Sequence, residues 1–170
     1  ENTSETGLDE WTITEPVDPT ASPNPFDYLA FSGITIGAFP ANADQVQIDV
    51  YTPGGWVSGT PGPTAVVPGS VDPDDIRGIR ITFSSSTGEL IEVGEDVDIS
   101  IVTEQRDLGD IPSNIVVDNT VGSTVERDGE TDTSTGDADY TIEANLPEVT
   151  ADKSFDEESV LHGDSVDATL

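Results

Sequence analysis

Hydrophobic and polar residues alternate with a period of two through much of this chain. Val46, Ile48 and Val50 lie on one side of an extended segment, and Gln47 and Asp49 lie on the other. The same alternation recurs at residues 79–83, 97–101, 140–144 and 166–170. Side chains of a β-strand point alternately to its two faces, so each run predicts a strand with one buried and one solvated face.

Turn sequences rich in proline and glycine separate these runs, as at Pro53-Gly54-Gly55 and Asp128-Gly129. No window has a sustained helical period, and twelve prolines and sixteen glycines disfavour helices. One helical turn is expected at residues 73–77, where a proline precedes two aspartates. We therefore predict an all-β fold, an antiparallel β-sandwich of about ten to twelve short strands.

Two breaks interrupt the strand pattern in the second half of the chain. Residues 130–139 are rich in Thr, Ser, Gly and Asp, and they predict a long polar hairpin loop. A second break lies at residues 145–148, after which the strand pattern restarts. The predicted organisation is a main β-sandwich over residues 1–147 and two further strands within residues 148–170.

Composition excludes several classes of partner. Thirty-five acidic residues against five basic ones give a formal net charge of −30, which repels nucleic acids and anionic membrane surfaces. No run approaches the roughly 20 apolar residues that span a membrane, so membrane insertion is not expected. Cysteine is absent, so disulfides do not contribute to stability.

The sequence lacks the constellations that enzymes use. His162, the only histidine, lies in a Leu-His-Gly-Asp turn that is typical of a polar loop, and there is no Gly-x-Ser-x-Gly elbow. No pair of acids is grouped with aromatic residues as in a glycosidase. We therefore predict that the chain is not an enzyme.

Calcium is the only cofactor that the sequence suggests. Two acidic clusters offer oxygen ligands at close spacing: Asp72, Asp74 and Asp75, and then Asp128, Asp132, Asp137 and Asp139. Neither cluster matches the twelve-residue helix-loop-helix calcium pattern. Calcium binding and a simply solvated acidic surface both remain open.

The two ends of the chain carry a recognisable arrangement. Residues 149–160 contain the only lysine, Lys153, and lead through Gly163-Asp164 into the alternating run at 166–170. Residues 1–8 form a polar turn before residues 11–16, which end in an acid and a proline. Together they resemble the Ig-like repeats that build the stalks of Gram-positive, especially actinobacterial, cell-surface proteins.

The resemblance implies an extracellular structural module of a cell-surface fibre, pilus or adhesin stalk. It further implies that the last two strands belong to the next repeat or complete a neighbouring copy, head-to-tail. The donor residues would then be Phe155, Val160, Val166, Ala168 and Leu170. The alternative is that these are two ordinary C-terminal strands of one sandwich.

The resemblance also implies an intramolecular isopeptide crosslink. In such repeats a lysine on the first strand can bond to an asparagine on a late strand, helped by a carboxylic acid in an apolar pocket. Here Lys153, Asn119 and Glu15 match those roles by position. The alternative is a solvated lysine, or one paired with the adjacent Asp152.

A second function remains open beside the structural one. A calcium-dependent adhesin domain would hold a carbohydrate or protein of a host or environmental surface through its acidic loops and Trp56, which follows a Pro-Gly-Gly turn. Trp11 is expected in the core.

Overall fold

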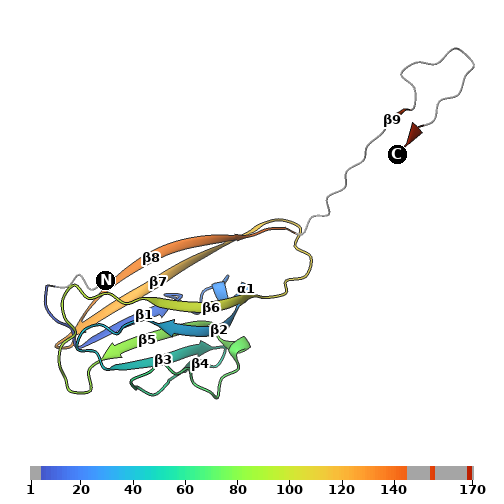
Figure 1. Ribbon diagram of the computed structural model, residues 1–170. Coiled ribbons are helices and arrows are strands. Elements are labelled where there is room, and N and C mark those ends of the chain that lie inside the picture. Colours follow the sequence, from blue (N-terminus) through green and yellow to red (C-terminus); the bar gives the residue numbers. More distant parts are fainter. Residues whose placement is uncertain (1–4, 145–153, 156–167, 170) are drawn as a thin grey trace, which may run out of the picture.

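The computed structural model describes residues 5–144, 154–155 and 168–169. These residues form an antiparallel all-β structure with ten strands, one short α-helix and one 3-10 turn (Figure 1). The predicted all-β sandwich and the predicted helical turn at 73–77 are both confirmed. The strands are β1 Glu10–Glu15, β2 Leu29–Ile36, β3 Gln45–Thr52, β4 Gly55–Val57, β5 Gly78–Ser84, β6 Ile99–Gln105, β7 Ile115–Arg127, β8 Glu130–Ile142, β9 Ser154–Phe155 and β10 Ala168–Thr169. The helices are α1 Pro25–Tyr28 and the 3-10 turn η1 Pro73–Asp75.

One layer is a six-stranded sheet in the order β4-β3-β5-β1-β7-β8. In its register Ile13 on β1 lies opposite Ile81 on β5, which lies opposite Ile48 on β3. Residues that face each other across antiparallel strands share a face of the sheet. The alternating β-branched and aromatic side chains therefore build one apolar face, as the pattern predicted.

The second layer is much smaller. In the described part of the chain it consists of β2 and β6, which lie against the large sheet (Figure 1). Phe31 of β2 and the buried side chains of β1, β3 and β5 form a single core. The fully buried members of this core include Val46, Ile48, Val50, Ile79, Ile81 and Phe83. The core is thus centred on the half of the large sheet that β2 and β6 cover.

The stretch 130–139 is not the hairpin loop that the sequence predicted. It belongs to β8, which pairs with β7 along its whole length, from Arg127↔Glu130 to Ile115↔Ile142. The turn is the Asp128-Gly129 pair, whose φ angles of 51° and 82° fit a two-residue hairpin. The prediction was wrong because both faces of β8 are exposed from Glu130 to Asp139. Neither face has to be apolar, so the sequence of this strand shows no alternation of hydrophobic and polar residues.

Short helical segments close one end of the sandwich. Asn24 caps α1, since its side chain accepts from Phe26 N while Asp27 accepts from Asn24 N. Arg77 and Arg106 both donate to the Phe26 carbonyl, at 2.8 and 2.9 Å, and so hold this turn to the sheets. No helix among the described residues combines the length and apolar character needed to cross a bilayer.

The two short strands near the C-terminus pair only with each other. In β9 and β10, Phe155 lies opposite Ala168 and Ser154 opposite Thr169. Among the residues that the structure describes, they form a two-stranded sheet without a partner strand in the sandwich.

Candidate functional site

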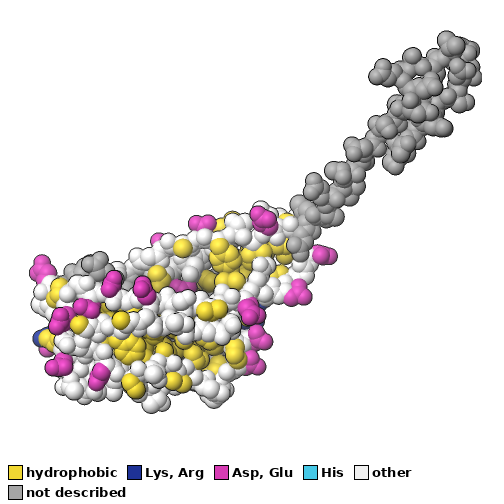
Figure 2. Space-filling model, in the orientation of Figure 1, with side chains coloured by type: hydrophobic (Ala, Val, Ile, Leu, Met, Phe, Trp, Pro, Cys, Tyr) yellow, Lys and Arg dark blue, Asp and Glu magenta, His cyan; other side chains and the backbone are white. Residues whose placement is uncertain are grey.

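An open groove of about 410 Å³ separates the two layers beside β6. Residues of both layers line it because, in the described part of the chain, β6 pairs with β2 alone and has no second neighbouring strand. Hydrophobic surface gathers between the β7–β8 hairpin and β6 in Figure 2. The lining comprises Ile13, Glu15, Pro25, Phe26, Leu29, Ile81, Ile99, Ile101, Thr103, Asn119, Val121 and Tyr140.

The walls of the groove are mainly aliphatic. Ile99 and Ile101 face inward from β6, whereas Ser100 and Val102 between and after them are exposed. Ile13 and Ile81 form the opposite wall on the large sheet. These four isoleucines therefore sit on strands whose alternation fixes which side chains enter the groove, whereas Pro25 and Phe26 enter it from α1.

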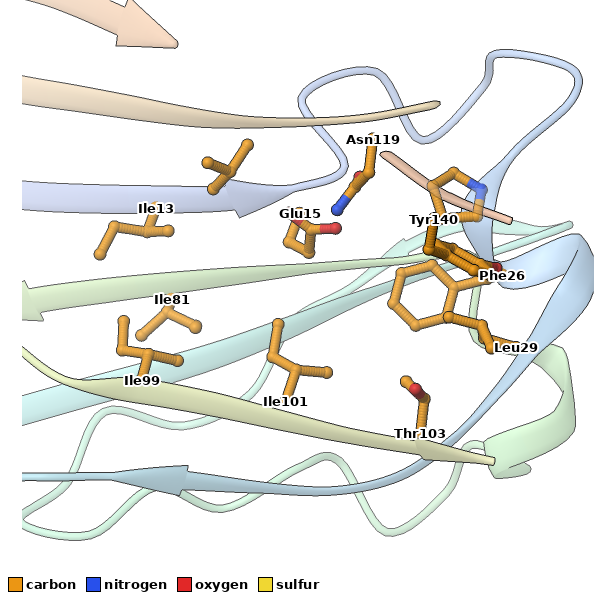
Figure 3. Close-up of a pocket in the computed structure, with 12 residues that line it drawn as sticks. Ile13, Glu15, Phe26, Leu29, Ile81, Ile99, Ile101, Thr103, Asn119 and Tyr140 are labelled. Atoms are coloured by element: carbon orange, nitrogen blue, oxygen red, sulfur yellow. The ribbon is translucent and has the colours of Figure 1, made fainter. Parts of the chain in front are cut away.

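Four polar side chains interrupt this apolar lining, Thr103 of β6 and three that lie close together at one end of the groove. Glu15 ends β1, Asn119 lies in the middle of β7, and Tyr140 lies near the end of β8. The Asn119 amide nitrogen points at the Glu15 carboxyl group (Figure 3), and the two side chains are hydrogen-bonded. Burial raises the pKa of Glu15, and the hydrogen bond with Asn119 opposes that rise in part.

Two buried atoms of this site have no hydrogen-bond partner among the described residues. They are Asn119 Oδ1 and the Tyr140 hydroxyl oxygen. Burial also raises the pKa of Tyr140, with a smaller contribution from nearby Tyr28. Buried polar atoms of native proteins are usually hydrogen-bonded. The groove thus holds a hydrogen-bonded carboxyl–carboxamide pair, beside which two buried oxygen atoms have no partner among the described residues.

Glu15→Gln should raise the melting temperature at neutral pH. Burial raises the pKa of Glu15 in the folded state, which means that the ionised carboxylate destabilises the fold. The protein therefore has its full stability below pH 4.5, the usual pKa of this group, and loses part of it as the pH rises through the raised pKa. Solvent screening keeps the gain near 1 kcal/mol, which corresponds to about 2–4 °C. Thermal melts at about pH 4 and pH 7 test this, with the variant melting higher only at the higher pH.

Glu10→Gln is the matched control, because Glu10 is exposed at the start of the same strand and loses the same charge. A rise of equal size in the control at pH 7 would assign the effect to net charge and not to burial of Glu15.

The structure brings together two of the three predicted crosslink residues. Glu15 and Asn119 are in contact, although their positions in the sequence differ by 104. Lys153 lies outside the described residues. Of the predicted donor residues, Val160, Val166 and Leu170 also lie outside them, and Phe155 and Ala168 are described only as paired strand positions.

The predicted calcium ligands are dispersed. Asp72 caps η1 through Asp74 N, and Asp74 contacts Arg106 at 3.5 Å. Asp132 and Asp137 occupy opposite faces of β8, since their positions differ by five, an odd number. Within residues 5–144 and the two short C-terminal strands, no three acidic or histidine side chains come together as metal ligands do.

The two tryptophans are both engaged within the fold. Trp11 is 3% exposed in the core, as predicted, and donates to Ser123 Oγ at 2.9 Å. Trp56 packs edge-on against Tyr51, and the Arg80 guanidinium lies 4.6 Å from its ring centroid. An open sugar-stacking platform at Trp56 is therefore not supported.

Tyr140 is the site residue that the sequence did not single out. Its alternation with Ile142 predicted an inward position on a strand, but its place beside Asn119 depends on the register of the β7–β8 hairpin.

Comparison with protein-family models, with curated proteins and with solved structures finds no match for this chain.

Proposed function

We propose that this protein is a structural subunit or repeat of an extracellular surface fibre, assembled head-to-tail by β-strand complementation of an Ig-like sandwich. One observation carries the proposal: a six-stranded layer faces a layer of only two strands. Because the second layer has fewer strands, an apolar groove stays open over β1 and β7. The inner face of β8 is likewise not covered by any described residue.

The open edge of β6 provides the backbone contacts that an added strand requires. Among the described residues β6 pairs only with β2, from Ile36↔Ile99 to Leu29↔Gln105. Its other edge therefore presents peptide groups without a strand partner. A strand added there would extend the small sheet and lie directly over the groove.

The C-terminal segment, residues 149–170, supplies an occupant of matching size and pattern. Residues 149–160 extended would span about 40 Å, enough to follow the whole of β6. The pairing of Phe155 with Ala168 places these two apolar residues on one face of a hairpin. Such a hairpin would raise the small layer from two strands to four, opposite a layer of six.

A second copy is the source that we propose for this hairpin. The chain's own β9 and β10 pair with each other and not with β6 or β8. A groove at one place and a donor at another on the same chain make a heterologous contact, which repeats without closing. The product is a fibre.

The full chain should therefore self-associate as its concentration rises, and more strongly at high salt. Each copy has a net charge of −30, and the screening length falls from about 10 Å at 0.1 M salt to about 3 Å at 1 M. Sedimentation velocity over a concentration series at both salt levels, with electron microscopy, should show species growing into unbranched fibres.

A chain that stays monomeric at every concentration in both salts would contradict the proposed function. If that monomer also gained thermal stability with calcium, the adhesin interpretation would be favoured instead.

A further inference from the structure

The outer edge of β8 is the longest open strand edge in the described part of the chain. All thirteen residues of β8 pair with β7, and β8 is the last strand of the six-stranded sheet. In Figure 1 it lies at the rim of the sandwich. Residues 130–139 are exposed on both faces. The edge therefore presents a row of peptide N–H and C=O groups to which a further strand can pair.

This edge lacks most of the features by which edge strands avoid pairing. Strand β8 contains no proline and no lysine, and its register with β7 runs without a bulge. The features that remain are four carboxylates, at Glu130, Asp132, Asp137 and Asp139. Like charges directly opposite each other destabilise a strand pair, so the effect of these carboxylates depends on what faces them.

Two copies of β8 are complementary when they run antiparallel about a two-fold axis at Gly136. This is the one antiparallel register that pairs all thirteen residues of both strands. No carboxylate then faces another: the opposed pairs are Asp137 with Thr135, Asp139 with Thr133, Asp132 with Tyr140, and Glu130 with Ile142. Moving the axis by one residue to Asp137 would place that carboxylate opposite its own copy and shorten the pairing.

The β7–β8 hairpin already contains a pair of the same kind. Asp137 lies opposite Thr120 of β7 and accepts from its hydroxyl at 2.6 Å. In the two-fold arrangement Thr135 of the second copy would face the same aspartate from the other side. An ionised carboxylate has two oxygens and accepts several hydrogen bonds, so Asp137 has the capacity for both threonines.

We propose that the β8 edges of two copies pair antiparallel about Gly136, so that two six-stranded sheets join into one. The same patch on both copies makes the contact isologous, and it closes at a dimer. It uses the outer edge of β8 and leaves the groove beside β6 free, so it is independent of the proposed function.

The pairing is expected to be weak, because one strand edge is a small interface and each copy carries a net charge of −30. A dissociation constant on the order of 1 mM is expected at about 0.15 M salt. At micromolar concentrations this contact therefore adds nothing to the association of the chain.

The test uses the full chain with Ile101→Asp, which blocks the groove against a donated strand. Sedimentation velocity between about 10 μM and about 2 mM should show monomers converting to dimers, with no larger species. Thr135→Asp in this background places a carboxylate directly opposite Asp137, twice in each dimer. It should weaken dimerisation at least about tenfold.

Two further variants test the register. Thr131→Asp is the matched control, because it adds the same charge to the same face of β8 but lies opposite Thr141. Combining Thr135→Asp with Asp137→Thr exchanges the two residues without changing the net charge, and each carboxylate again faces a threonine. Both should dimerise within about twofold of the Ile101→Asp parent, and melting curves should show every variant folded.

Each outcome decides the inference without deciding the proposed function. Monomers at every concentration would overturn it. Equal weakening by Thr135→Asp and Thr131→Asp, or an exchange that fails to restore the dimer, would overturn the pairing about Gly136. Head-to-tail assembly is measured separately, because Thr135→Asp alone, with the groove intact, should still form fibres.

Discussion

Ile101→Asp should prevent assembly of the full chain under conditions in which the wild type forms fibres. Ile101 faces the groove from the middle of β6, directly beneath the position of a donated strand. A carboxylate at this position would be buried against the apolar face of the donated strand. Among the described residues, no Lys or Arg side chain lines the groove and could pair with it. A loss of about 2 kcal/mol or more is typical of a central interface residue, which lowers the association constant about 30-fold or more.

Val102→Asp is the control for that experiment. Val102 is the next residue of the same strand but points outward and is 47% exposed. It adds the same charge to the same backbone, and its fibres should match those of the wild type at equal salt. Equal loss of assembly in both variants would assign the effect to net charge, and melting curves of each variant would show whether the fold is intact.

Asp49→Ala should produce the largest loss of stability among single polar substitutions. Asp49 is 2% exposed, although it lies on the outer face of β3. It accepts from Arg80 at 2.6 and 3.0 Å, from Gln47 at 2.7 Å and from Gly59 N at 3.0 Å. Removing the carboxylate leaves these donors without their acceptor, which costs about 3 kcal/mol. The melting temperature should fall by about 6–12 °C.

Asp74→Ala is the matched substitution at an exposed ion pair. The Asp74 side chain is 76% exposed and lies 3.5 Å from Arg106. Exposed pairs of this kind contribute little, so the melting temperature should change by about 2 °C or less. A comparable fall in both variants would contradict the structural role assigned to Asp49.

The sequence predicts the fold class because burial on one face imposes a period of two. Val46, Ile48 and Val50 alternate with polar residues, and all three are fully buried. The same reasoning fails for β8, because a strand exposed on both faces carries no such period. Helix α1 was also missed, since its four residues are too few for a helical stripe and its capping by Asn24 is a local contact.

The candidate site could be predicted only in part. Glu15 and Asn119 were named as partners through a resemblance, and their contact depends on β1 and β7 being neighbours, which alternation does not specify. The groove is a property of sheet order, because it arises along the edge of β6 that has no strand partner among the described residues. Tyr140 enters it through the β7–β8 register, which the Asp128-Gly129 turn sets.

Head-to-tail strand donation is tested most directly by mixing two assembly-defective variants of the full chain. Ile101→Asp blocks the groove but keeps a working donor, and Phe155→Asp blocks the donor but keeps a working groove. Each should stay monomeric alone where the wild type assembles. Their equimolar mixture should form a one-to-one heterodimer and nothing longer, as seen by native mass spectrometry and sedimentation. A mixture that remains monomeric, or fibres from either variant alone, would contradict strand donation between copies.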